Sequence, residues 1–174
     1  MATRTRSRTL SRAPSSPHGT QSWLAVVRAY NLCDAVMSAR LAELGLRIGE
    51  HEVLATVATV PGITQQELAA RCFVAKSGVS MLLTQMEGKA LVGREADAAD
   101  ARVRRLFLTP AGQALAEKTL KIQAEVVSVM VEGASEAELA MVADVMQRVA
   151  AKLETLRDAL PAGVAPAARS RVSR

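Results

Sequence analysis

Apolar residues recur every three or four positions over most of the chain, which is the spacing of one face of an α-helix. The first such run extends from Trp23 to Leu44 and stops near Gly45. The second covers residues 50–59 and stops at Pro61-Gly62, a pair of residues that breaks helices. The pattern therefore predicts two amphipathic helices, one long and one short.

Two more short helices are predicted next. Thr64 and Glu67 have the spacing of a capping box, in which the Thr hydroxyl accepts from the third helical amide and the Glu carboxylate accepts from the Thr amide. This helix should end around Cys72, and another should cover residues 75–89 with its apolar side chains on one face. Two short helices separated by a tight turn predict a helix-turn-helix.

Short extended runs follow at residues 91–95 and 103–108, with a small polar segment between them, and they predict a β-hairpin of the kind called a wing. Thr109-Pro110 then supplies an N-cap and a proline at the first helical position. Ser135 and Glu138 form a second capping box, and the helix it opens should end near Leu160. We therefore predict a mainly α fold with a small β-hairpin (α+β): a winged helix-turn-helix with long N- and C-terminal helices.

The amino-acid composition indicates which side chains fill the core and where the positive charge lies. Hydrophobic residues make up 49% of the chain but aromatic residues only 2%, which predicts small aliphatic side chains between closely packed helices. The net charge of +5 comes from the chain ends, because residues 1–19 and 161–174 hold seven arginines. These segments are otherwise rich in Ser, Thr and Pro, so we expect two disordered basic tails around one domain at 20–160.

The sequence offers little for metal, redox or catalytic chemistry. Cys33 and Cys72 lie in helical runs, and one of the two histidines, His18, lies in the N-terminal tail. Phosphate-loop, dinucleotide-binding and nucleophile-elbow motifs are absent from the sequence. We expect no metal, no cofactor, no enzymatic activity, and both cysteines as small buried hydrophobes. No apolar stretch is long enough for a secretory signal or a membrane span, so we expect a cytoplasmic protein without a membrane partner.

The segment from Thr64 to Gly112 resembles the multiple-antibiotic-resistance regulator (MarR) family. The resemblance rests on Leu91-Val92-Gly93-Arg94, on Asp97 followed by Asp100-Ala101-Arg102, and on Leu106-Phe107-Leu108-Thr109-Pro110-Ala111-Gly112. It implies a homodimeric transcriptional regulator that binds double-stranded DNA at a palindromic operator, often a repressor released by a small molecule or by oxidation. The DNA-binding lobe would then cover about 48–110, and the dimerisation helices about 20–45 and 110–160.

Three positions depart from the family pattern. Met81 and Gln85 lie on the second helix of the helix-turn-helix, where relatives commonly carry basic residues, and Ala101 lies where a second arginine is frequent in the wing. The surface expected to face DNA is therefore less cationic than is usual in the family.

The candidate DNA contacts divide into two chemical kinds. Short polar side chains on the recognition helix can contact base edges in the major groove, whereas cations at its start and in the wing can bind phosphates or enter the minor groove. Gln65 is a candidate phosphate clamp at a helix start, and Asp100 is expected to cap the wing turn and position Arg102. The alternative is that these residues form only solvated faces. The candidates are Gln65, Lys76, Ser77, Ser80, Thr84, Gln85, Arg94, Asp100, Arg102 and Arg104.

The long flanking helices carry more apolar residues than one small domain can cover, notably at 126–131 and 139–156. Burial of these residues against a second copy of the chain predicts a homodimer. A small-molecule pocket is expected between these helices and the DNA-binding lobe, with Trp23, Tyr30, Met37 and His51 as candidates by helix position.

Some alternatives remain open at this stage. Glu50 and Glu52 flank His51 and favour a surface histidine over a sensor. A thiol-based redox regulator would instead use Cys33 or Cys72. A winged-helix protein-interaction module without DNA binding would account for the missing basic residue at Met81.

Overall fold

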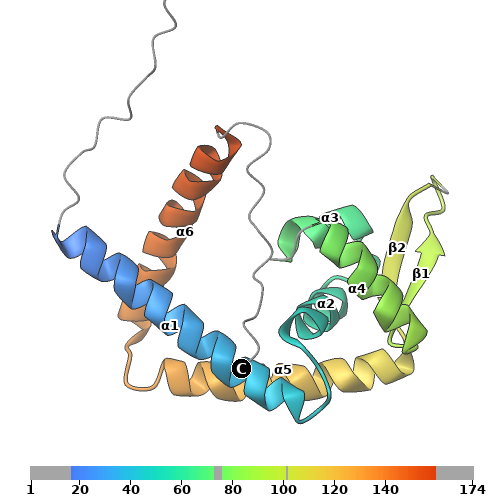
Figure 1. Ribbon diagram of the computed structural model, residues 1–174, viewed down its shortest axis with the longest axis horizontal. Helices are drawn as coiled ribbons and strands as arrows, with labels where there is room; N and C mark the ends of the chain where they lie inside the picture. The colour runs from blue at the N-terminus through green and yellow to red at the C-terminus, as the bar shows by residue number, and fades with distance from the viewer. Residues whose placement is uncertain (1–16, 73–75, 101, 160–174) are drawn as a thin grey trace, which may run out of the picture.

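The computed structural model describes residues 17–72, 76–100 and 102–159, and Figure 1 shows the arrangement of their helices and strands. In chain order the elements are α1 (Pro17–Ala42), α2 (Ile48–Thr59), α3 (Gln65–Arg71), α4 (Lys76–Gly88), β1 (Val92–Ala96), β2 (Arg104–Leu108), α5 (Pro110–Met130) and α6 (Glu136–Asp158). The predicted fold class, a winged helix-turn-helix between long flanking helices, is confirmed. Ala101 and the tails 1–16 and 160–174 lie outside the described residues.

The helix starts follow from their caps. The Thr64 hydroxyl accepts from the Glu67 amide at 3.2 Å, and the Glu67 carboxylate accepts from the Thr64 amide at 2.8 Å. Ser135 and Glu138 repeat this arrangement at the start of α6. One boundary was wrong: α1 begins at Pro17, so residues 17–19, which we placed in the disordered tail, are helical. Proline suits the first turn of a helix because an amide there has no helical partner.

The hairpin is extended by the loop before α3. β1 and β2 pair antiparallel, with Val92 opposite Leu108 and Ala96 opposite Arg104. On the other edge of β2, the Gly62 amide donates to the Leu106 carbonyl at 2.9 Å, and the Leu106 amide donates to the Ile63 carbonyl at 2.9 Å. These bonds place the start of α3 directly beside the wing.

The lobe formed by α2, α3, α4 and the wing has its core around α2, which lies between the other elements of the lobe in Figure 1. Leu54 of α2, Leu68 of α3, Leu83 and Met86 of α4 and Leu106 of β2 are each 0% exposed. α5 contacts both α2 and α1, and so connects the lobe to the N-terminal helix. Burial of these aliphatic side chains provides the main driving force for assembling the lobe.

The C-terminal helix α6 lies apart from this lobe (Figure 1) and has no buried residue among its described positions. Its apolar side chains are exposed, including Met141 (67%), Val149 (40%) and Leu153 (59%). α1 and α5 also expose large apolar side chains, such as Trp23 and Val129. Within the described residues, no helix is long and apolar enough to cross a membrane.

Candidate nucleic-acid interface

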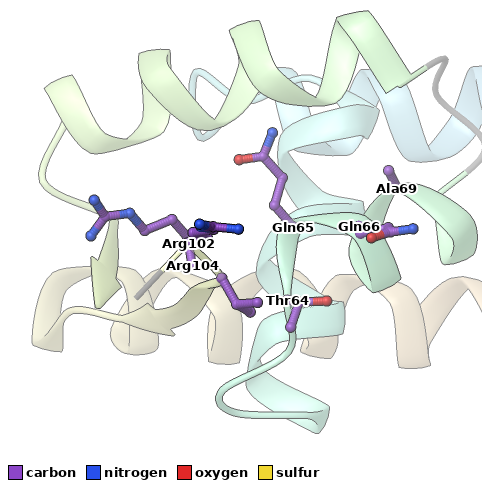
Figure 2. Close-up of a pocket in the computed structure, with 7 residues that line it drawn as sticks. Thr64, Gln65, Gln66, Ala69, Arg102 and Arg104 are labelled. Atoms are coloured by element: carbon purple, nitrogen blue, oxygen red, sulfur yellow. The ribbon is translucent and has the colours of Figure 1, made fainter. Parts of the chain in front are cut away.

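A groove of about 430 Å³ lies between the start of α3 and the wing (Figure 2). Figure 2 shows Arg102 and Arg104 on the wing side of this groove and Gln65 and Gln66 on the α3 side. Arg102 and Arg104 are exposed, and neither takes part in the ion pairs found among the described residues. Both charges are therefore available to an anion that enters the groove.

Arg105 holds the wing in this position. Its Nε donates to the Asp97 carboxylate, and its Nη1 donates to the Gly62 carbonyl at 2.9 Å. Asp97 also accepts the Ala99 amide at 2.7 Å; this bond, followed by the one from Arg105, lowers the pKa of the Asp97 carboxyl. Arg105 is thus bonded within the protein, whereas Arg102 and Arg104 face the groove.

Asp100 caps the turn of the wing. Its Oδ1 accepts the Arg102 backbone amide at 2.9 Å, which fixes the chain where Arg102 leaves the turn. The sequence predicted this turn chemistry. Asp100 orients Arg102 through the backbone and not through the guanidinium group.

The outward face of α4 is formed by Ser80, Met81, Thr84 and Gln85, all of which are exposed. Val79, Leu83 and Met86 on the opposite face are 0% exposed and fix the rotation of the helix on the lobe. Lys76 and Ser77 lie in the first turn of α4, but their side chains are outside the described set. The four exposed residues are neighbours on one face because helical residues three or four apart lie side by side.

Arg94 of β1 faces α4 and not the solvent. Its guanidinium lies 3.1 Å from the Glu87 carboxylate and donates to the Thr84 hydroxyl at 3.5 Å, and its side chain is only 22% exposed. Thr84 in turn donates to the Ser80 carbonyl at 3.1 Å. Sequence analysis placed Arg94 among the cations of the interface but missed its pairing with Glu87, because this contact joins two elements and has no local signature.

Sequence analysis also missed an ion pair that fixes the far end of α4. Lys89 Nζ lies 2.5 Å from Glu50 Oε1, and Glu50 is 3% exposed. Glu50 Oε2 accepts the Arg47 amide at 2.9 Å and so caps α2. Burial raises the pKa of Glu50, but the bonds from Lys89 and Arg47 outweigh it, and the pKa lies below its ordinary value. The carboxylate therefore joins the start of α2 to the end of α4.

The geometry of this lobe agrees with a sequence comparison. A model of the MarR family matches residues 44–103, a segment that contains α2, α3, α4 and β1. This segment of the chain is similar to the MarR family of transcriptional regulators. The model ends inside the wing, so it covers the helix-turn-helix and the turn residues on which the sequence resemblance rested.

Individual proteins are similar to this chain in sequence or in fold. The chain is 29% identical over 105 residues to an uncharacterized HTH-type transcriptional regulator of Bacillus cereus, covering 60% of this chain and 69% of the relative.

Two solved structures share the fold. The MepR–DNA complex of S. aureus has a TM-score of 0.66 and 24% identity, and it covers 76% of this chain and 97% of that one. BpsR of Bordetella bronchiseptica, whose DNA binding is regulated by 6-hydroxynicotinic acid, has a TM-score of 0.65 and 18% identity, covering 75% and 98%. The matched family and the Bacillus cereus relative are described as transcriptional regulators and not as enzymes.

The structure also has an apolar pocket of about 350 Å³ between α1, α2 and α5. Tyr30, Met37 and His51, three of the four predicted ligand contacts, line it. Trp23 does not line it: it lies about two helical turns earlier on α1 and is 62% exposed. The structure therefore separates Trp23 from the other three candidates.

His51 is buried, at 5% exposure, so the expectation of a surface histidine was wrong. Burial lowers the pKa of His51, and a hydrogen bond with Gln123 opposes this effect. Glu50 and Glu52 flank His51 in the sequence, but α5 covers the face of α2 on which His51 lies. Cys33 and Asp34 also line the pocket, and their spacing from Tyr30 and Met37 on one face of α1 would have identified them.

The two cysteines are free thiols. Cys72 is buried at the end of α3, and burial, together with the nearby Glu52, raises the pKa of its thiol. A raised pKa disfavours the reactive thiolate. The redox alternative therefore gains no support at Cys72.

Proposed function

We propose that this protein is a cytoplasmic, homodimeric, sequence-specific repressor that binds a palindromic double-stranded DNA operator and is released by a small-molecule effector. The observation that carries this proposal is the combination of two surfaces on one lobe. α4 presents a face of small polar and apolar groups, and the groove beside α3 presents two arginines that join none of the ion pairs among the described residues. A helix of this kind fits the major groove, while wing cations fit the adjacent backbone or minor groove.

The proposed contacts divide between bases and backbone. Ser77, Ser80, Thr84 and Gln85 would contact base edges, and Lys76, Arg102 and Arg104 would neutralise phosphate or minor-groove potential. Gln65 would contact a phosphate from the α3 side of the groove. Arg94 and Asp100 would act indirectly, because the first is bonded to Glu87 and Thr84 and the second caps the wing turn.

The unpartnered apolar side chains of α1, α5 and α6 support a homodimer. They lie on helices outside the DNA-binding lobe, and α6 buries none of its described residues within its own chain. A two-fold dimer covers the same surface on both copies and presents two recognition helices to half-sites about 10 base pairs apart. This symmetry is the basis for proposing a palindromic operator.

The pocket between α1, α2 and α5 supports an effector site. It joins helices proposed for dimerisation to α2 of the DNA-binding lobe, so a ligand there could change the separation of the two recognition helices. Tyr30, Met37 and His51 would contact the ligand, and the buried His51 would offer a polar contact in an apolar environment. BpsR, which shares the fold, is regulated by a small aromatic acid.

Selection of bound sequences from a random DNA pool, followed by a mobility-shift titration, tests the proposal. We expect a palindromic site bound at least about a thousandfold more tightly than random DNA. A reporter placed behind that site should be repressed by the protein. Absence of an enriched sequence would contradict the proposal and favour the protein-interaction module, and reporter activation would overturn the assignment as a repressor.

A further inference from the structure

The centre of the outward face of α4 is apolar. Met81 is 65% exposed, and Thr84, one turn later, is exposed beside it. From Val79 to Gly88 the sequence contains no basic residue, and its one acidic residue, Glu87, is paired with Arg94. The central part of the recognition surface therefore presents no net charge to DNA.

Thr84 has little hydrogen-bonding capacity left for a base. Its hydroxyl donates to the Ser80 carbonyl at 3.1 Å and accepts from Arg94 at 3.5 Å. With its one proton committed within the helix, the group that Thr84 can offer to a base is chiefly its methyl. Met81 likewise offers a flexible, polarisable thioether and its methyl group.

Only one base presents an apolar group in the major groove. Thymine carries a 5-methyl there, whereas the other base edges offer hydrogen-bond donors and acceptors. An exposed thioether next to a threonine methyl matches that group and would gain from removing it from water. The exposed apolar residues of the proposed dimer surface lie on α1, α5 and α6, so a second copy is not the expected occupant of this face.

We propose that Met81, with Thr84, recognises the 5-methyl group of one thymine in each half-site and so determines specificity at that position. The proposal rests on the proposed function, because it requires α4 to lie in the major groove. It assigns a role to one of the three residues that depart from the family pattern. Met81 then replaces a charged contact by an apolar contact that distinguishes thymine from cytosine.

The test uses the selected operator with each thymine replaced in turn by deoxyuridine, which removes only the methyl group. Wild-type protein should lose about fourfold in affinity at one position per half-site, and about fifteenfold when both are replaced. Adding a 5-methyl group to a cytosine placed there should raise affinity by a similar factor. Met81→Ala and Thr84→Ser should bind the thymine and deoxyuridine sites with nearly equal affinity.

Gln85→Ala is the control, because it should weaken binding overall but keep the ratio of thymine to deoxyuridine affinity. If wild-type protein binds its selected site but no deoxyuridine substitution matters, this inference is wrong and the proposed function stands. If Met81→Ala keeps the full ratio, the methyl group is recognised elsewhere and the assignment to Met81 is overturned. If no DNA sequence is enriched at all, the proposed function fails and this inference fails with it.

Discussion

The backbone of Gly112 in α5 lies directly against the carbonyl group of Leu91, in the segment that leads from α4 into the wing. A Cβ atom at residue 112 would overlap that carbonyl. The same junction is bonded twice, since the Thr109 amide donates to the Leu91 carbonyl at 3.1 Å and the Thr109 hydroxyl to the Ala90 carbonyl at 2.6 Å. The wing and the long helix α5 are therefore joined at one tight contact that only glycine permits.

Replacing Gly112 by Ala should destabilise the protein by about 3 kcal/mol or more, because the added methyl must displace backbone atoms. The measurement is equilibrium unfolding in urea. Gly88→Ala is the matched control: a Cβ at Gly88 meets nothing within 4 Å, so its effect should stay within about 1 kcal/mol. Similar stability of the two variants would show that the junction can relax.

Replacing Glu50 by Gln should lower the free energy of unfolding by about 1–2 kcal/mol at neutral pH, since a charge-assisted bond from the half-exposed Lys89 to the buried carboxylate is lost. The folded-state pKa of Glu50 lies below its unfolded value, so the stabilisation is complete above the unfolded pKa and is lost as the pH falls through the folded pKa. Urea unfolding of both proteins from neutral pH to below pH ~4 should therefore show their stabilities converge in acid.

The control for Glu50 is Glu43→Gln, because Glu43 is exposed in the turn after α1. This variant should match the wild type at every pH. A stability difference for Glu50→Gln that does not change with pH would mean that side-chain shape, and not charge, accounts for the effect.

Replacing Arg102 or Arg104 by Ala should weaken binding to selected and random DNA alike. Each variant should reduce the slope of log affinity against log salt by about one unit per subunit, because one phosphate contact is lost. Arg157→Ala, at the end of α6, should leave the slope unchanged. A wild-type slope in both wing variants would show that the groove in Figure 2 does not face DNA.

Replacing Val129 by Glu should convert the proposed dimer to a folded monomer, as measured by sedimentation. Val129 is 73% exposed within one chain, so a charge there is tolerated by the monomer and costly only in an interface. Val149→Glu on α6 should behave in the same way. Met81→Glu tests another exposed apolar position, on α4 (65% exposed), and should remain dimeric.

Peroxide treatment should leave DNA binding unchanged, and a thiol reagent should label Cys72 of the native protein slowly. Cys72 is buried and the pKa of its thiol is raised, so little of the reactive thiolate is present. Labelling should become rapid in denaturant. Fast labelling of native protein with loss of DNA binding, abolished in Cys33→Ser or Cys72→Ser, would instead establish the redox-sensing alternative.

The sequence by itself determined the order of the elements and most of their ends. Capping boxes at Thr64 and Ser135, the Thr109-Pro110 start and the apolar spacing all act within a few residues, so they can be recognised without the fold. The same local rules predicted the turn at Asp100 and the polar positions on the outward face of α4. The predicted hairpin after two short helices then indicated the fold class, a winged helix-turn-helix.

Tertiary structure decided which of the candidate side chains remain available for binding. Four arginines of the wing look alike in the sequence, but they differ in the structure. Arg94 pairs with Glu87 and Arg105 pairs with Asp97. Arg102 and Arg104 instead line the groove beside α3. His51 has acidic neighbours along the chain, yet α5 covers it, and Trp23 falls outside the pocket that contains Tyr30. These outcomes depend on contacts between residues far apart in the chain, whose partners are set by helix packing and strand register, and local sequence patterns carry no information about such distances.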